Sequence, residues 1–126
     1  MNFPENLKYT KDHEWIKIEG NIGTIGITEH AAGELGDVVY IDIPDAGAEV
    51  SQHDTFGTIE AVKTVADLFS PVSGRLTEVN SALNDAPETV NQDPYNEGWI
   101  VKMELTNMDE VAGLMDAAAY RELVGQ

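Results

Sequence analysis

Residues 56–74, FGTIEAVKTVADLFSPVSG, contain the features on which the fold of this chain depends. Two runs of strand-forming residues, 55–62 and 64–70, are similar in length and meet at Lys63. Lysine and arginine make up only 7 of the 126 residues, and no acidic residue stands directly beside Lys63. The position of this rare cation therefore needs an explanation.

Two interpretations of Lys63 are open at this level. One is a long edge strand in which the lysine acts as a gatekeeper against aggregation. Spacing alone favours it, because no Asn-Gly, Asp-Gly or Pro marks a turn at 62–64. The other is a tight hairpin that presents Lys63 to solvent. Its hydrated ammonium would then be a poor nucleophile but an accessible handle that another enzyme could acylate.

Short strands continue on both sides of this stretch. Gly20-Asn21 predicts a hairpin turn between two of them. The predicted strands cover 13–20, 22–28, 37–44 (with Val39, Ile41 and Ile43 on one face), 75–80 and 99–105 (with Trp99, Val101, Met103 and Leu105 on one face). This pattern predicts a mainly β fold, a flattened β-barrel or sandwich of two antiparallel sheets with short helices, in a single domain over 1–126.

Helices are predicted in two places. Thr28 is a candidate N-cap and Gly36 a candidate stop for a helix between them. After a polar loop at 84–98, Asn107 and Glu110 resemble a capping box at the start of a helical tail. Near the end of the chain we expect a short apolar stripe, formed by Tyr120, Leu123 and Val124.

The charge and composition argue against several classes of function. Twenty-three acidic residues give a net charge of −16, which opposes binding to nucleic acid or to anionic membranes. It favours solubility, or steering toward partners with basic entrances. Without cysteine there is no disulfide, thiol nucleophile or Cys-type zinc site. We expect a cytoplasmic bacterial protein, because no segment resembles a signal peptide or a membrane span.

No catalytic constellation is found in the sequence. His13, His30 and His53 are far apart and follow no metal-ligand spacing, and no nucleophile elbow or phosphate loop is present. We therefore expect no metal site, and a protein that enzymes act upon rather than an enzyme.

Four motifs in series resemble the glycine cleavage system H proteins. The central one is GTIEAVKTVADLFSPVSG, which is similar to the family's lipoyl-lysine region E-S-V-K-A followed by D-x-x-S-P-x-S-G. Here Ala61 and Thr64 replace the family's Ser and Ala, and both are small. The other three motifs are LKYTKDHEWI, IGITEHAAGELGDVVYIDIPDAG and VNQDPYNEGWIVKMEL, so the resemblance covers about residues 7–105.

The resemblance implies a carrier with lipoate in amide linkage to Lys63. A PLP-dependent glycine decarboxylase would load the lipoyl arm with an aminomethyl group, and an aminomethyltransferase would pass the carbon to tetrahydrofolate. Dihydrolipoamide dehydrogenase would then reoxidise the arm. Enzymes that attach lipoate or octanoate would also be partners. We expect a monomer, cytoplasmic in bacteria or in the mitochondrial matrix of a eukaryote.

Family members shelter the loaded arm in a cleft, where a carboxylate would pair with the cationic amine. The resemblance makes Glu14, in the matching H-E-W, the first candidate, and Asp67, in D-x-x-S-P, the second. Each is alternatively an ordinary surface acid of a very acidic chain.

Two rival carriers fit the sequence less well. A biotin carrier would place methionines where Val62 and Thr64 stand, so these residues argue against it. A lipoyl domain of a 2-oxo-acid dehydrogenase would commonly have Asp in place of Val62. A relay that hands lipoyl or octanoyl groups to other complexes, and an unmodified binding module, are further alternatives.

Overall fold

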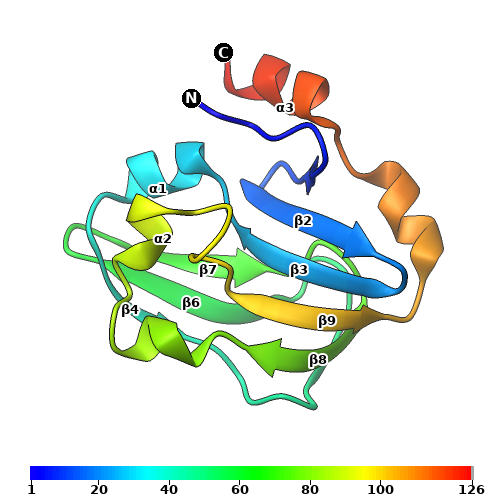
Figure 1. Cartoon of the computed structure of the whole chain (residues 1–126), viewed down its shortest axis with the longest axis horizontal. Helices are drawn as coiled ribbons and strands as arrows, with labels where there is room; N and C mark the ends of the chain where they lie inside the picture. The colour runs from blue at the N-terminus through cyan, green and yellow to red at the C-terminus, as the bar shows by residue number, and fades with distance from the viewer. Residues whose placement is uncertain (126) are drawn as a thin grey trace.

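The computed structural model describes residues 1–125 and consists of two antiparallel β-sheets with short helices around them (Figure 1). The larger sheet has the strand order β1-β2-β3-β9-β8-β5, and the smaller has the order β4-β6-β7. The strands are β1 (Lys8–Tyr9), β2 (Glu14–Glu19), β3 (Ile22–Ile27), β4 (Val38–Asp42), β5 (Glu49–Val50), β6 (Thr55–Ala61), β7 (Val65–Phe69), β8 (Gly74–Val79) and β9 (Val101–Leu105). The helices are α1 (Glu29–Leu35), α2 (Thr89–Gln92) and α3 (Ala117–Val124), with 3-10 helices η1 (Ser81–Asn84) and η2 (Met108–Gly113).

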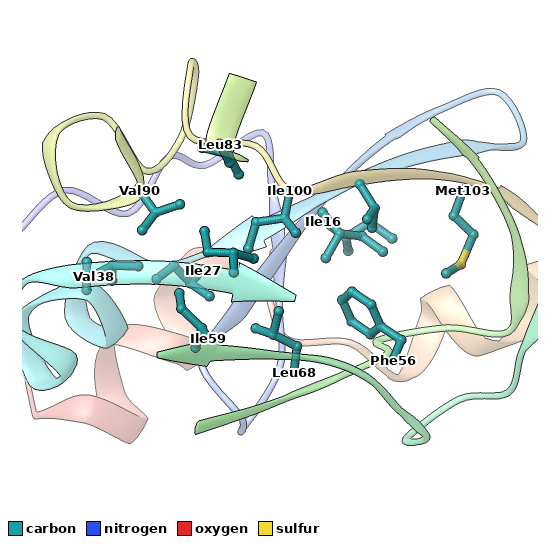
Figure 2. Close-up of a cluster of buried hydrophobic side chains, with 14 of the residues drawn as sticks. Ile16, Ile27, Val38, Phe56, Ile59, Leu68, Leu83, Val90, Ile100 and Met103 are labelled. Atoms are coloured by element: carbon teal, nitrogen blue, oxygen red, sulfur yellow. The ribbon is translucent and has the colours of Figure 1, made fainter. Parts of the chain in front are cut away.

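The predicted mainly β fold with two antiparallel sheets is confirmed, but the barrel alternative is wrong. Within residues 1–125, no strand of the smaller sheet pairs with a strand of the larger one. The sheets are held together by side chains instead. Figure 2 shows Ile59 and Leu68 of the smaller sheet lying against a core to which Ile16, Ile27 and Ile100 contribute from the other side. All five are 3% exposed or less.

A second apolar cluster covers the outer face of the larger sheet. Trp15 on β2 packs there with Phe3, Tyr9 and Tyr120, and its indole Nε1–H donates to the Pro94 carbonyl oxygen at 2.9 Å. Figure 1 shows α3 lying above β2, with the N-terminal segment beside it. Both faces of the beginning of β2 are therefore buried, which strict alternation of polar and apolar residues would not produce.

Local signals for turns and helix ends are confirmed. The turn after β2 contains Gly20 at φ +63°, and Glu19 faces Ile22 across the hairpin. The Thr28 side chain accepts from the Ala31 N–H, and Gly36 ends α1 at φ +76°. These features depend on residues within one turn of each other, so their sequence patterns are sufficient to identify them.

The prediction that Val39 shares a face with Ile41 in the strand at 37–44, which corresponds to β4, is wrong. Val39 is 47% exposed, whereas Val38 and Ile41 are 3% and 5% exposed. An irregularity in the pairing with β6 between Val38 and Tyr40 shifts the alternation by one residue. Such a bulge places two residues opposite one, and a period-two pattern does not predict it.

The polar loop at 84–98 contains a helical turn that the sequence did not predict. Val90, in α2, is fully buried. The side chain of Asn91 accepts from the Val38 N–H at 3.0 Å and donates to the Gly36 carbonyl oxygen at 2.7 Å. This loop therefore supports the segment between α1 and β4.

The helical tail is confirmed with Asn107 as its N-cap, but the predicted capping box does not form. Asn107 accepts from the Asp109 N–H at 3.1 Å, but the Glu110 carboxylate accepts from the Ser73 N–H at 2.6 Å and from its hydroxyl at 2.8 Å. In the apolar stripe Tyr120 is fully buried, while Leu123 is 50% exposed. Within residues 1–125, none of the helices has the length and apolar character needed to cross a membrane.

Candidate functional site

The chain reverses direction at Lys63. Strands β6 and β7 pair antiparallel with Glu60 opposite Val65, and the Ala61 N–H donates to the Thr64 carbonyl oxygen at 2.7 Å. Lys63 is therefore at the apex of a tight hairpin and is exposed. The hairpin interpretation is confirmed, and the interpretation of one long edge strand is wrong.

Contacts from outside the hairpin hold this turn. The Val62 N–H donates to the carbonyl oxygen of Asp37, which precedes β4, at 3.0 Å. The Lys63 side chain lies beside Gly36, where an added Cβ would come within 3.4 Å of Lys63 Cε. Within residues 1–125, no carboxylate oxygen lies within the 4.0 Å ion-pair distance of Lys63 Nζ. Among the described residues, the lysine is thus positioned by its backbone and has no charge partner.

Two concavities lie beside the β6–β7 hairpin. An open depression of about 470 Å³ is lined by Lys63 itself, with Met1, His30, Gly33 and Glu34. A deeper cavity of about 190 Å³, which we call the cleft, shares Glu34 with it. The cleft is lined by Asp12, His13, Glu14, Ile27, Ala31, Glu34, Leu35, Ile59, Ala66, Asp67 and Leu68. Its walls therefore come from α1, from both sheets and from the residues that precede β2.

Glu14 is the buried carboxyl group of the cleft. It is 2% exposed; its Oε1 accepts from the Thr10 hydroxyl at 3.0 Å and its Oε2 from the Phe69 N–H at 2.9 Å. Burial raises the pKa of Glu14 to about 8, although both hydrogen bonds oppose this shift. Near neutral pH the Glu14 carboxyl group is therefore largely protonated, and a cation beside it would favour its ionised form. Asp67 lines the same cleft from β7, but its side chain is exposed.

His13 is a cleft residue that the sequence analysis did not single out. Its Nδ1 lies 2.8 Å from the Tyr120 hydroxyl, and its ring centroid lies 4.8 Å from that of His30. Burial, followed by the nearby His30, lowers the pKa of His13. His13 and His30, which are distant in the sequence, therefore lie side by side in the fold. The available signal was the position of His13 directly before Glu14.

In the part of the chain that the structure describes, the paired histidines lack a third side chain placed to complete a metal site. Across residues 1–125 there is no group of three histidine or acidic side chains placed to hold a metal ion. The cleft thus combines one buried carboxyl group with largely apolar walls, and it adjoins the depression that Lys63 lines. A cationic ligand in this cleft would face the Glu14 carboxyl group.

Comparisons with known proteins agree with this geometry. The family model described as "Glycine cleavage H-protein" matches residues 7–126. The chain is 56% identical to the glycine cleavage system H protein of Symbiobacterium thermophilum, over 94% of this chain and 93% of that protein. It is 55% identical to the protein of the same name from Chlorobium limicola, over the full length of both.

A solved structure gives the same result for the fold. The crystal structure of a glycine cleavage system H protein from Mycobacterium marinum superposes with a TM-score of 0.91 at 38% identity, covering 98% of this chain and 100% of that one. Fold, motifs and full-length similarity therefore lead to one conclusion: this chain belongs to the glycine cleavage H-protein family.

Proposed function

We propose that this chain is the lipoyl-bearing shuttle of the glycine cleavage system, with lipoate attached through an amide bond to Lys63. The observation that carries the proposal is the exposed apex of the β6–β7 hairpin, where Lys63 lies free of ion pairs within residues 1–125. Acylation would remove the charge of the ammonium, so the arm could enter buried sites without the cost of desolvating a cation. The bound lipoyl group supplies the disulfide and dithiol chemistry that this cysteine-free chain lacks.

We further propose that the cleft shelters the arm when it is loaded with an aminomethyl group. The depression beside Lys63 shares Glu34 with the cleft, so the two concavities adjoin at this residue. An arm on Lys63 would pass Glu34 to reach Glu14. Glu14 would ionise and pair with the cationic amine, and the apolar walls would exclude water. Asp67 would add negative charge to the same cleft.

The partners follow from this role. The loading enzyme would be the PLP-dependent glycine decarboxylase, the receiving enzyme the aminomethyltransferase, and the reoxidising enzyme dihydrolipoamide dehydrogenase. A lipoate- or octanoate-attaching enzyme would modify Lys63. Val62 and Val65, which are 77% and 60% exposed, offer these partners an apolar surface beside the lysine. The chain itself supplies attachment, positioning and shelter, and catalyses none of these steps.

Residues 1–126 would form one carrier domain, which we propose to be monomeric and cytoplasmic. The family model spans nearly the whole chain, and the named relatives are bacterial proteins.

Intact mass tests the attachment site directly. Protein produced in a lipoate-competent host should gain the mass of one lipoyl or octanoyl group, and Lys63→Arg should lose it. Lys17→Arg is the matched control, because Lys17 is an exposed lysine on β2 outside the cleft and should leave the modification intact. An unmodified wild-type protein, in a host that lipoylates its other substrates, would overturn the proposal. So would a modification that persists in Lys63→Arg.

A further inference from the structure

The Tyr120 hydroxyl connects the C-terminal helix to the wall of the cleft. Tyr120, on α3, is fully buried, and its hydroxyl lies 2.8 Å from Thr28 Oγ1 and 2.8 Å from His13 Nδ1. Thr28 is the N-cap of α1, and His13 lines the cleft beside Glu14. One hydroxyl therefore joins three segments that are far apart in the sequence.

One assignment of the hydroxyl hydrogens of Thr28 and Tyr120 gives each of them an acceptor. Thr28 Oγ1 already accepts from the Ala31 N–H at 3.1 Å. Within residues 1–125, the Tyr120 oxygen is the partner that remains for the buried Thr28 hydroxyl hydrogen. If Thr28 donates to Tyr120, then Tyr120 donates to His13 Nδ1. The opposite direction would leave the Thr28 hydroxyl hydrogen without an acceptor in the interior, which is costly.

This arrangement fixes the tautomer of His13. An Nδ1 that accepts a hydrogen bond carries no hydrogen, so the neutral ring has its hydrogen on Nε2. The His13 backbone is held as well, because its N–H donates to the Thr10 carbonyl oxygen at 3.1 Å and its carbonyl accepts from the Thr28 N–H at 3.0 Å. His13 also adopts φ +67°, a conformation that a side-chain-bearing residue rarely adopts without support from its surroundings.

The charged and titratable groups around His13 come from several elements. From α1, His30 lies 4.8 Å away between ring centroids, and Glu34 lines the same cleft. Asp12 and Glu14 flank His13 in the chain, Tyr120 contacts it from α3, and Asp67 lines the cleft from β7. A proton on His13 would reverse the hydrogen bonds to Tyr120 and place a positive ring beside His30.

We propose that Tyr120 is a positioning residue of the arm cleft: its hydroxyl holds His13 as the neutral tautomer with the hydrogen on Nε2. The wall beside Glu14 then carries no positive charge when a cationic aminomethyl arm enters. This inference rests on the proposed function for the identity of the arm, but the tautomer itself is a property of the unloaded protein.

The tautomer can be measured without any arm. Imidazole ¹⁵N NMR of the unmodified protein should show a His13 Nδ1 without hydrogen and an Nε2 that bears one. Tyr120→Phe removes only the hydroxyl, and should raise the His13 titration midpoint by about 0.5 to 1 pH unit, as expected for the loss of one hydrogen bond to the neutral form. Tyr95→Phe is the matched control. It removes another hydroxyl of the same cluster, which accepts from the Glu29 N–H at 3.0 Å, and should leave His13 unchanged.

Two results of that experiment would overturn the inference. One is a hydrogen on His13 Nδ1 in the wild-type spectrum, which decides the question even if Tyr120→Phe folds poorly. The other is an identical His13 titration in wild type and Tyr120→Phe.

The effect on the arm is measured as the decay of the aminomethyl-loaded protein near the raised His13 midpoint. Tyr120→Phe should shorten the lifetime of the loaded form severalfold, and Tyr95→Phe should not. If Glu14→Gln shortens this lifetime and Tyr120→Phe leaves it unchanged, the inference is overturned and the sheltering cleft stands. If neither variant changes it, the sheltering role of the cleft fails, and this inference fails with it, while attachment at Lys63 is judged separately by mass.

Discussion

The Phe69 N–H donates to Glu14 Oε2 at 2.9 Å, and this hydrogen bond joins β2 of the larger sheet to β7 of the smaller one. Phe69 ends the strand that leads away from Lys63, and Glu14 lines the cleft. The buried carboxyl group is therefore held in a fixed position relative to the lysine hairpin.

The charge of Glu14 should control the lifetime of the loaded form. Glu14→Gln retains acceptor oxygen and shape but cannot ionise, so we expect unchanged lipoylation and about tenfold faster decay of the loaded protein, the equivalent of one pKa unit of interaction. The paired amine should lower the pKa of Glu14 in the loaded form below the value of about 8 in the unloaded protein, so the wild-type lifetime should fall as the pH drops through that lowered pKa. Decay is followed by mass spectrometry. Glu19→Gln is the control, because Glu19 is an exposed acid on the same strand, and the loaded form of this variant should decay as fast as the wild type. If the loaded form of Glu14→Gln also decays at the wild-type rate, the prediction is contradicted.

Folding stability should depend on pH through the same carboxyl group. Folding raises the pKa of Glu14 from 4.5 to about 8 through burial, so the folded state retains a proton that the unfolded state releases. The stabilising contribution is fully present below about pH 4.5 and is lost as the pH rises through about 8. The amide introduced by Glu14→Gln does not ionise, so the variant should not show this loss of stability as the pH rises. Its free energy of unfolding should rise relative to the wild type by a few kcal/mol across that window. Urea unfolding over this pH range measures the difference, and a constant difference would refute the assignment.

Gly36 should matter for the lysine as well as for the helix end. It adopts φ +76° and ψ −155°, a region that is almost restricted to glycine, and its Cβ position faces Lys63 Cε at 3.4 Å. Gly36→Ala should cost about 2 kcal/mol of stability and alter the rate of lipoylation. Gly20→Ala is the control, since Gly20 has φ +63° but no atom within 4 Å of its Cβ position. It should cost about 1 kcal/mol and leave lipoylation unchanged. Equal modification rates in the two variants, measured by time-resolved mass analysis, would contradict the role of Gly36.

Two other glycines should respond to alanine in opposite directions. A Cβ at Gly26 would come within 2.6 Å of the buried Trp15 ring, which is fixed by its hydrogen bond to Pro94. Gly26→Ala should therefore destabilise the protein by about 2–3 kcal/mol. Gly33 lies within α1 with open space at its Cβ position, so Gly33→Ala should stabilise the protein by about 0.5–1 kcal/mol. Thermal unfolding compares both with the wild type, and a stabilising Gly26→Ala would show that Trp15 repacks.

Residues close together in the sequence decided those features that could be predicted. The Gly20-Asn21 turn, the Thr28 cap and the alternation in β9 each depend on a few neighbouring residues. The ordered motifs were sufficient to indicate the family and to single out Lys63. Even there, the local pattern at 62–64 favoured one long edge strand, which is wrong. The turn is supported by a hydrogen bond to Asp37, a residue distant in the sequence, and a local pattern does not contain this contact.

Tertiary structure decided the features that depend on distant partners. The bulge that exposes Val39 arises from its pairing with β6, and the burial that raises the pKa of Glu14 arises where two sheets and a helix meet. Tyr120 contacts His13 across 107 positions of the chain. The sequence by itself singled out Lys63 as the candidate attachment residue, since motif and residue type are local properties. Only the tertiary structure decided which groups share the cleft and which of them are buried and hydrogen-bonded, because both properties depend on the packing of distant segments.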